Sequence, residues 1–526
     1  MVLLLLLAAA AGAGTLVAGS REPLALRCAL GLAVWGEALF LLAACGWLRP
    51  VPIVALLLVA VGGGAMRMRS WPRVSLLPAL AVVAIGVPAF LLALHPPLAF
   101  DETLYHLPFV RDLAETGRLR FLGHLRFPVF PQLHELLCVP VYLLAGDAAT
   151  HLMSLMEVAV TAGLAAAWAR RYSVQAGPLA AALFIGSPII VHLATILYVE
   201  AALTLFVVAG FYMLDVALGE ARRGPLVLSG FFFGAACSVK YLGGFFAVAA
   251  LLVVLVRRRR GVLLFASAVV AAALPTTLWI VLASGSPVFP FAPSLFGSNA
   301  WALPPEPVLS FFDALRVPWD VTFARQRMNA QPPVTPLLIP MLLAIAAAAM
   351  RSGRARVFLL LAAAYLALFT FLPRDTRYLV VFLPLFSVAA AVIVATRLPR
   401  WTTLAAAATG VAYLAWRLAL LGLPPATPEA RATELATRVP GYTALTRAGS
   451  SPVYVCGGEQ LQAYARGPLL GDWAGLHPYA RVLDGDGTLA ERLRTRNVGY
   501  VLVVKARCTT SIDGLTLVHE DAGAQL

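Results

Sequence analysis

The sequence predicts a polytopic α-helical membrane protein with about 12 to 14 transmembrane helices and a small C-terminal α/β domain. Three observations lead to this fold class. Hydrophobic residues make up 60% of the 526 residues and charged residues only 13%, whereas soluble domains are about half apolar and a quarter charged. The apolar residues form long uninterrupted runs, and roughly 20 such residues span a bilayer. The composition then changes near residue 423, where Asp, Glu, Gly and Thr become frequent.

The basic charge of the chain follows its predicted membrane topology. The formal net charge is +14, which by itself would fit a nucleic-acid partner. The arginines, however, lie in short connectors at the ends of apolar runs, as is typical of cytoplasmic loops. These connectors include Arg170 and Arg171, Arg222 and Arg223, Arg257 to Arg260, and Arg397 and Arg400. We therefore expect no nucleic-acid partner, and we expect both chain ends on the outer face of the membrane.

The apolar runs between the basic connectors give the predicted spans. We expect helices at 2–19, 24–45, 51–66, 76–95, 150–168, 178–194, 200–217, 226–239, 242–256, 261–283, 334–350, 357–372, 378–396 and 402–422. The 226–256 stretch fits either two short helices or one helix with a re-entrant piece. Residues 1–422 then form a transmembrane domain with outer loops at 96–150 and 284–333. In the first loop, an amphipathic helix over Leu107–Leu119 is expected to lie along the membrane interface with its apolar face in lipid.

Residues 423–526 are predicted to form an extracytoplasmic α/β domain. Its expected elements are a helix at Pro428–Val439, a strand at Val453–Cys456, a helix at Leu489–Arg496 and a strand at Tyr500–Val504. Cys456 and Cys508 both lie in this domain. They could form a disulfide bond, but no spacing rule fixes their pairing.

The polar stretch Phe100–His106, directly after a predicted span, holds the first candidates for catalysis. Asp101 and Glu102 form an adjacent pair of carboxylates at the membrane surface, and Tyr105 and His106 follow them. One carboxylate can accept a proton from an acceptor hydroxyl, while its neighbour holds a metal ion, the acceptor or an arginine. The alternative interpretation is that acidic residues simply belong in an outer loop.

Further candidates lie beside later spans. Lys240 stands between two apolar helices, where a charge is costly unless it faces a cavity or an anion. Alternatively, the Lys240 side chain extends along the helix so that its charge reaches the membrane interface. Arg374 and Arg377 precede a span, and arginine suits a phosphate because it is always charged and binds bidentately. Alternatively, these arginines pair with Asp375 or with lipid headgroups.

Together these stretches resemble the GT-C glycosyltransferases, especially the branch of protein O-mannosyltransferases and lipid A aminoarabinose transferases. The Asp-Glu stretch is similar to the first outer loop of that family, which implies that Asp101 is the catalytic carboxylate and that Glu102 takes the adjacent family position. Segments similar to later family motifs follow in the same order at Ile196–Glu200, Ser238–Gly244, Gly285–Pro290 and Pro373–Tyr378. Glu200 departs from the family pattern, because Asp is commoner at that position.

The resemblance implies an inverting glycosyltransferase of the bacterial inner membrane, with its active site and C-terminal domain on the periplasmic side. It implies that Lys240, Arg374 and Arg377 stabilise the phosphate of a polyprenyl-phosphate sugar donor, with Glu200 and Tyr378 as further site residues. The acceptor would be a glycan, a lipid or a protein, and membrane lipids would surround the helices. The sugar and the acceptor stay open.

The cofactor and two rival functions also stay open. No cofactor is implied firmly, although Glu102 and His106 offer oxygen and nitrogen ligands for a divalent metal. A transporter or flippase of lipid-linked or amphipathic solutes would instead carry ionisable residues deep within its spans, in symmetric halves. A non-catalytic membrane scaffold that displays the tail domain would make Asp101 dispensable.

Overall fold

The chain folds into two units, and the computed structural model describes residues 1–67, 76–304, 308–329, 332–508 and 514–526. Unit 1 comprises Met1–Leu94, Pro131–Thr276 and Pro305–Leu423. Unit 2 comprises His95–Phe130, Thr277–Pro304 and Pro424–Leu526. Each unit is therefore assembled from segments that lie far apart in the sequence.

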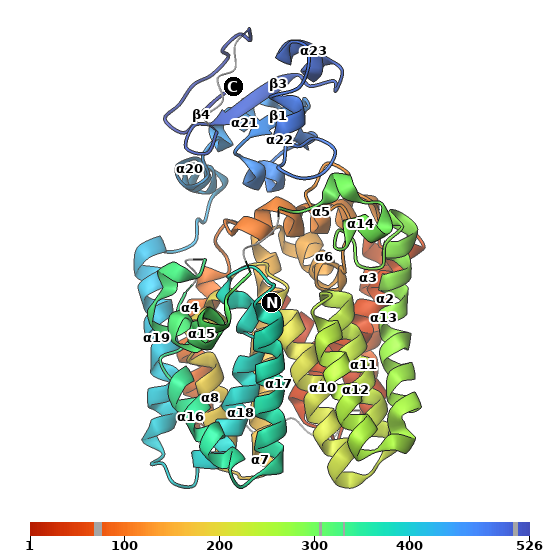
Figure 1. The fold of residues 1–526 in the computed structure, drawn as a ribbon, viewed down its shortest axis with the longest axis vertical. Coiled ribbons are helices and arrows are strands. Elements are labelled where there is room, and N and C mark those ends of the chain that lie inside the picture. The colour runs from red at the N-terminus through yellow and green to blue at the C-terminus, as the bar shows by residue number, and fades with distance from the viewer. Residues whose placement is uncertain (68–75, 305–307, 330–331, 509–513) are drawn as a thin grey trace. The chain divides into compact units, whose positions relative to one another are not determined.

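Unit 1 is built from apolar helices (Figure 1). They are α1 (Val2–Ala18), α2 (Leu24–Ala44), α3 (Pro50–Arg67), α4 (Leu76–Leu92), α6 (Leu133–Ala145), α7 (His151–Arg170), α8 (Ala176–Ile185), α9 (Pro188–Leu193), α10 (Glu200–Glu220), α11 (Arg223–Val239), α12 (Gly243–Arg257), most of α13 (Val262–Ser284), α15 (Phe311–Phe323), α16 (Leu338–Ala349), α17 (Gly353–Phe369), α18 (Phe382–Val394) and α19 (Trp401–Leu421). Short 3-10 turns join several of them, at Ala148–Thr150, Arg259–Gly261, Arg325–Arg327 and Thr376–Leu379.

Within the described residues, 6 helices are long and apolar enough to cross a membrane, and further apolar helices are shorter. The long ones are α2, α3, α7 with the turn before it, α10, α13 with the turn before it, and α19. The predicted fold class, a polytopic helical membrane protein, is confirmed. The helices are buried to very different extents. In the most apolar stretch of α10, 83% of the residues are buried, whereas only 22% are buried in that of α13.

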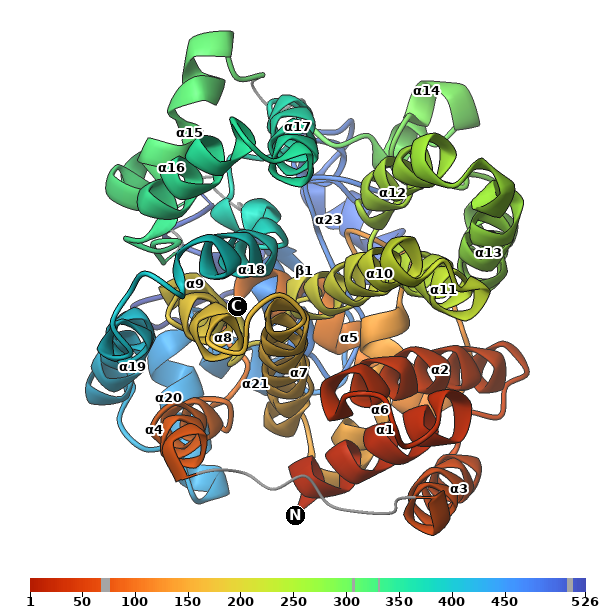
Figure 2. The same cartoon turned by 90° about the horizontal axis from the view of Figure 1, so that it is seen from below.

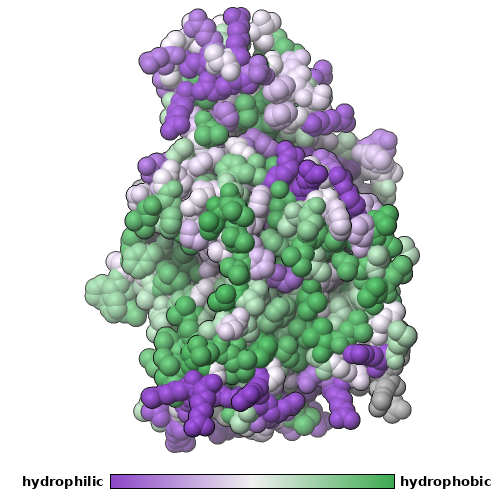
Figure 3. All heavy atoms as spheres, turned by 90° about the vertical axis from the view of Figure 1, so that its right-hand side faces the viewer, coloured by the Kyte–Doolittle hydropathy of each residue, from purple (hydrophilic) through white to green (hydrophobic). Residues whose placement is uncertain are grey.

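This difference separates a packed interior from an apolar surface. Helix α10 contacts α7, α11 and α18, and the end-on view of Figure 2 shows it between them. On the face drawn in Figure 3, apolar side chains cover most of the helical surface, and hydrophilic side chains gather at the ends of the helices. An apolar surface of this extent is suited to contact with lipid tails.

Two findings refine the predicted spans. The 226–256 stretch forms two helices, α11 and α12, and the chain is extended at Lys240 between them. The apolar helix α6 lies inside the 96–150 stretch that the sequence predicted as an outer loop, and it belongs to unit 1. It escaped prediction because His134 and Glu135 in its first turn and Pro140 in its middle interrupt the apolar run.

Unit 2 contains a four-stranded sheet with the strand order β2-β1-β3-β4. Its elements are α5 (Leu107–Thr116), α14 (Pro293–Phe296), α20 (Pro428–Arg438), α21 (Tyr442–Ala448), β1 (Val453–Cys456), β2 (Leu469–Leu470), α22 (Tyr479–Val482), α23 (Leu489–Arg494), β3 (Tyr500–Val504) and β4 (Ala524–Gln525), with short turns at Glu102–His106, Asn299–Trp301 and Glu459–Ala463. Strand β1 is parallel to β2 and β3, and β3 is antiparallel to β4. The predicted strands and helices of the tail are therefore confirmed.

Segments that lie far apart in the sequence share the core of unit 2. Leu435, Val455 and Leu502 lie in its largest apolar cluster, and Leu98 from the first loop packs against them. Cys456 and Cys508, whose pairing the sequence left open, form a disulfide bond.

The structure corrects the expectation for the amphipathic helix of the first loop. Helix α5 ends at Thr116, and Gly117 follows in the left-handed conformation. Its apolar residues Phe109, Val110 and Leu113 are at most 2% exposed, and Phe109 packs against Leu122 and Leu125 of the same loop. The apolar face of α5 is thus buried in protein instead of lipid.

Candidate functional site

The Asp-Glu pair lies at the start of a single π-helical turn, Glu102–His106, in unit 2. Asp101 is the residue before this turn and is half-buried, whereas Glu102 is fully buried. The Ala99 backbone N–H donates a 3.0 Å hydrogen bond to Glu102 Oε2. Single π-helical turns are rare in proteins, but those that occur are frequently found at functional sites. Here the turn gives the two adjacent carboxylates different surroundings.

Aromatic rings surround the π-helical turn. The ring centroids of Tyr105 lie 4.2 Å from His106, 5.0 Å from Phe127 and 5.4 Å from Phe130. His106 is almost fully buried. Among the residues that the structure describes, no group of three or more His, Cys, Asp or Glu side chains could hold a metal ion. Glu102 and His106 therefore belong to no such group within the described part of the chain.

Arg126 is the cation of the Asp101 region. Its guanidinium carbon lies 3.3 Å from the centroid of the Trp473 ring, a cation–π geometry. Burial lowers the pKa of Arg126, while the nearby charges of Asp472 and Asp101 act in the opposite direction. Burial raises the pKa of the Asp472 carboxyl to about 7, and Arg126 opposes that shift. Arg126 thus connects the first loop electrostatically with the C-terminal segment of the same unit.

An ion pair of unit 2 lies beside Phe100, the residue before Asp101. Arg507 Nη1 lies 2.9 Å from Glu459 Oε2, and its guanidinium carbon lies 5.6 Å from the Phe100 ring centroid. The Tyr479 hydroxyl also donates to Glu459, whose side chain is almost fully buried. Together with Asp101, Arg126 and Asp472, these residues form what we call the Asp101 cluster: Asp101, Arg126, Glu459, Asp472 and Arg507.

The sequence did not identify the C-terminal members of the Asp101 cluster. Glu459, Asp472 and Arg507 stand in a tail with ordinary soluble composition, where single charged residues are unremarkable. The contacts of Asp472 with Arg126 and of Arg507 with Phe100 join residues more than 300 positions apart, and no periodic pattern encodes such a contact.

The Lys and Arg candidates lie in unit 1, around Glu200. Glu200 is the first residue of α10, and Lys240 caps the C-terminal end of α11. Lys240 Nζ donates to Glu200 Oε1 at 2.7 Å, and the two side chains are 24% and 3% exposed. The Lys240 ammonium also lies 4.4 Å from the centroid of the Tyr378 ring. The structure therefore gives Lys240 a carboxylate partner that the sequence did not predict.

Arg377 belongs to the same group of side chains. Its Nε lies 3.0 Å from Asp375 Oδ2 and 4.0 Å from Glu200 Oε1. Its guanidinium carbon lies 5.0 Å from the Tyr198 ring centroid. The pairing with Asp375, which the sequence gave as the alternative to phosphate binding, is thus present. We call Tyr198, Glu200, Lys240, Asp375, Arg377 and Tyr378 the Glu200 cluster.

Arg374 does not join the Glu200 cluster. Its backbone carbonyl accepts a 2.8 Å hydrogen bond from Asn329, and within the described part of the chain its side chain forms no ion pair with Glu200 or Asp375. The Arg-Tyr segment therefore contributes Arg377 and Tyr378 to the cluster, and Arg374 stays half-buried beside it.

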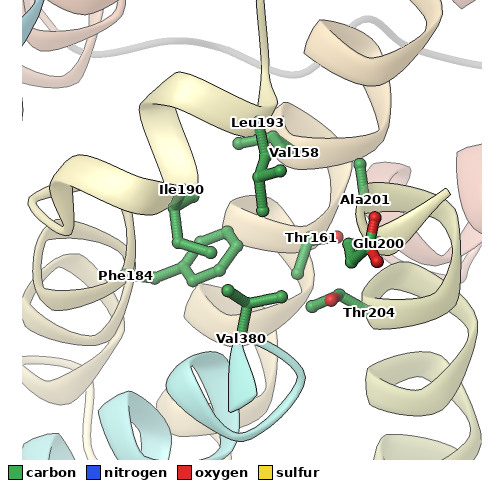
Figure 4. A pocket seen from close by; sticks show the side chains of 9 residues that line it. All are labelled: Val158, Thr161, Phe184, Ile190, Leu193, Glu200, Ala201, Thr204 and Val380. Carbon is green, nitrogen blue, oxygen red and sulfur yellow. The ribbon is translucent and has the colours of Figure 1, made fainter. Parts of the chain in front are cut away.

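A small cavity adjoins Glu200 inside unit 1 (Figure 4). It offers about 10 Å³ to the centre of a water molecule, which is room for about one water. Its lining is mostly apolar, and Glu200, Thr161 and Thr204 supply the polar atoms. Figure 4 shows the Glu200 carboxylate beside Thr161 and Thr204, with Val380 opposite. This cavity is too small for a sugar or a phosphate.

The structure thus brings the predicted site residues together in two groups. Asp101, Glu102, Tyr105 and His106 lie in unit 2. The other group, in unit 1, consists of Glu200, Lys240, Arg377 and Tyr378, with Arg374 beside it. One group offers a half-buried carboxylate next to a cation, and the other offers two cations held by two carboxylates.

The chain is similar in sequence to known proteins over limited segments. Residues 141–284 match the family described as dolichyl-phosphate-mannose-protein mannosyltransferase. An uncharacterised protein from Shigella flexneri is 43% identical over 58 residues, which are 11% of this chain and 29% of that protein. The chain thus matches less than a third of the length of that curated relative.

The similarity in structure is more extensive. The crystal structure of ArnT from Cupriavidus metallidurans in the apo state covers 86% of this chain and 98% of its own, with a TM-score of 0.60 and 16% sequence identity. The structure of the same protein bound to undecaprenyl phosphate covers 86% of this chain and 96% of its own, with a TM-score of 0.58 and 15% identity. At this level of identity the likeness establishes a shared fold.

Proposed function

We propose that the chain is a membrane glycosyltransferase of the GT-C type and that it transfers a sugar from a polyprenyl-phosphate carrier, a proposal supported by its ArnT-like fold and by the match of residues 141–284 to the mannosyltransferase family. The ArnT structure with bound undecaprenyl phosphate supports a donor of this class. The acceptor is a glycan, a lipid or a protein at the outer face of a bacterial inner membrane. In this proposal, residues 423–526 form an extracytoplasmic domain and 1–422 the transmembrane domain.

Asp101 is the proposed base. Its carboxylate accepts the proton of an acceptor hydroxyl as the acceptor oxygen attacks C1 of the sugar. The bond between C1 and the phosphate oxygen breaks at the same time, its electron pair stays on the polyprenyl phosphate, and the configuration at C1 inverts. Glu102 is fully buried and accepts a backbone N–H, so its role is to hold the π-helical turn that carries Asp101.

Lys240 and Arg377 are the proposed phosphate-binding residues, and Arg374 is a weaker candidate because it lies outside the Glu200 cluster. Both cations are partly buried, with side chains 24% and 14% exposed. A fixed cation in such surroundings stabilises the charge that develops on a leaving phosphate by several kcal/mol. Tyr378 packs beside both cations and fixes their position.

The observation that carries the proposal is the placement of Asp101. It is a half-buried carboxylate at a π-helical turn, it follows an apolar helix, and Arg126 lies near it in a chain with the GT-C fold. The ionised carboxylate is the form that accepts a proton from the acceptor.

Sugar release and transfer by the purified protein test the proposal, with a panel of polyprenyl-phosphate sugars as donors. We expect activity from the wild type and a loss of roughly 100-fold or more in Asp101→Asn, because the amide cannot accept the proton. The matched control is Glu115→Gln, which makes the same chemical change at an exposed residue of the same loop and should leave the rate unchanged. Equal rates in wild type and Asp101→Asn would remove Asp101 from the mechanism.

A transporter is the second candidate function, and one observation favours it. His134 Nδ1 and Glu157 Oε1 lie 3.0 Å apart between α6 and α7, and both side chains are fully buried. Ionisable pairs inside membrane helices often belong to transport pathways. The test is movement of a lipid-linked sugar across the membrane of proteoliposomes that contain the protein. If Glu157→Gln loses this movement and Asp101→Asn keeps it, the chain is a transporter and not a transferase.

A further inference from the structure

An arginine-lined cavity of about 370 Å³ lies in unit 1 where α11 begins and where α12 connects to α13. Arg223, Arg258, Arg259 and Arg260 line it together with Leu226 and Leu264. The Glu200 cluster lies at the opposite ends of α10 and α11, and a 21-residue helix such as α10 is about 30 Å long. The two places are therefore separated by about one bilayer thickness, and the cavity is distinct from the proposed active site.

The charge of this arginine pocket is uncompensated within the described residues. Its lining contains no Asp or Glu, and Arg223, Arg259 and Arg260 form no ion pair with any described acid. Glu220 is the acid nearest in sequence to Arg223, and it pairs with Arg171 at 3.3 Å and with Arg222 at 3.1 Å. Like charges this close are unfavourable unless an anion joins them.

Arg258 has a different role from the other three arginines. Its guanidinium donates to the backbone carbonyls of Ala217, Ala221 and Arg222 at 3.0, 2.6 and 2.9 Å. These contacts close the C-terminal end of α10 and fix one wall of the pocket. Arg223, Arg259 and Arg260 are exposed and remain available to a ligand.

Two helix N-termini add to the positive potential at the pocket. Helix α11 begins at Arg223 and helix α13 at Val262, and they are 17 and 23 residues long. The first N–H groups of a helix have no partner within the helix, and the helix dipole places a partial positive charge there. Anions, and phosphate groups above all, bind at such ends.

The surface around the pocket is apolar, which selects among phosphate-bearing ligands. Val256 near the end of α12 is 75% exposed, and Leu263 near the start of α13 is 81% exposed. Figure 3 shows apolar side chains reaching the hydrophilic ends of the helices on the face drawn. Free phosphate would use the arginines alone, whereas a phospholipid would also cover the apolar residues with its acyl chains.

We propose that the arginine pocket binds the phosphate headgroup of an anionic phospholipid. The cavity has room for a headgroup with one or two phosphates, which Arg223, Arg259 and Arg260 bind while acyl chains lie against α12 and α13. Basic pockets between membrane helices are suited to such headgroups. The bound lipid neutralises the arginines and stabilises α10 to α13 at this end.

Binding is measured with the full-length protein, delipidated in detergent and titrated with phosphatidylglycerol or diphosphatidylglycerol. The readouts are bound lipid counted by native mass spectrometry and the midpoint of thermal unfolding. We expect the double variant Arg223→Gln/Arg259→Gln to bind these lipids roughly 10- to 30-fold more weakly. Each arginine near an anionic headgroup strengthens binding roughly three- to fivefold, and the two factors multiply. The matched control is Arg397→Gln/Arg400→Gln, which removes two exposed arginines from the connector between α18 and α19.

Three outcomes would overturn the proposal. Equal binding of phosphatidylcholine would show that the anionic headgroup is not recognised. Equal stabilisation by inorganic phosphate would show an ion site that ignores acyl chains. An equal loss in the control variant would show that total charge, and not the pocket, determines binding.

Discussion

Lys240 and Glu200 provide the sharpest test of how unit 1 is held together. Lys240 Nζ and Glu200 Oε1 are 2.7 Å apart, and the Glu200 side chain is only 3% exposed. At an effective dielectric constant of about 20, two unit charges at this distance attract by roughly 6 kcal/mol before desolvation is subtracted. Removal of one partner leaves the other charge buried, which costs about 3–5 kcal/mol in comparable pairs.

We therefore expect strong coupling in a double-mutant cycle of Glu200→Gln and Lys240→Met. Each single variant should lose about 3–5 kcal/mol of unfolding free energy, and the double variant should lose about 3 kcal/mol less than the sum. Lys240→Met should be the milder single variant, because Arg377 still lies 4.0 Å from Glu200. The unfolding free energies come from denaturant titrations in mixed micelles.

The chain supplies a matched control for this cycle. Lys505 Nζ and Glu520 Oε1 are also 2.7 Å apart, but their side chains are 36% and 46% exposed. We expect little coupling there, because water and salt screen an exposed pair. Two results would refute the reasoning that burial gives the ion pair its strength. One is that the losses of unfolding free energy at Lys240 and Glu200 simply add, and the other is that both cycles give the same coupling energy.

Three other predictions concern unit 2. The pKa of Asp472 is about 7 instead of its usual 3.8, so the folded chain keeps a proton that the unfolded chain releases. Stability should therefore fall as the pH rises from about 4 to about 7, by up to roughly 4 kcal/mol, and thermal unfolding of Asp472→Asn at pH 5 and pH 8 should lack this slope. The bond between Cys456 and Cys508 spans 52 residues in sequence, and its replacement by two alanines should cost about 4 kcal/mol in denaturant titrations. Gly475→Ala should lower the unfolding temperature, because φ is +89° there and a Cβ would lie 2.4 Å from the Trp301 ring; an unchanged midpoint would contradict that contact.

The membrane helices could be predicted because their signal is local. An apolar run of helix length and a basic connector suffice, so the predicted spans at 24–45, 200–217 and 402–422 agree with α2, α10 and α19 to within a few residues. The apolar face of α5 could not be assigned in the same way. Lipid and a protein core select the same apolar side chains, and only the folded chain decides which of the two covers the helix.

The site could be predicted only in part, because charge partners are not local. The position of Lys240 between two apolar helices identified it as a buried cation, but nothing in the sequence paired it with Glu200, 40 residues earlier. Asp375 and Arg377 are two residues apart, so that pair could be foreseen. Asp472 could not be placed near Arg126, since the contact requires the C-terminal segment and the first loop to fold into one unit.

The Glu200 cluster has a consequence for donor binding. Lys240 and Arg377 carry two positive charges, and Glu200 and Asp375 carry two negative charges, so the cluster is neutral without a donor. Neutrality allows both cations to stay partly buried, which is costly for a single charge. If Lys240 and Arg377 bind the donor as proposed, the donor phosphate would add negative charge and compete with Glu200 for Lys240. In the proposed mechanism, the carboxylate that stabilises the cluster would therefore oppose donor binding, and the phosphate would leave more readily after transfer because Lys240 would pair with Glu200 again.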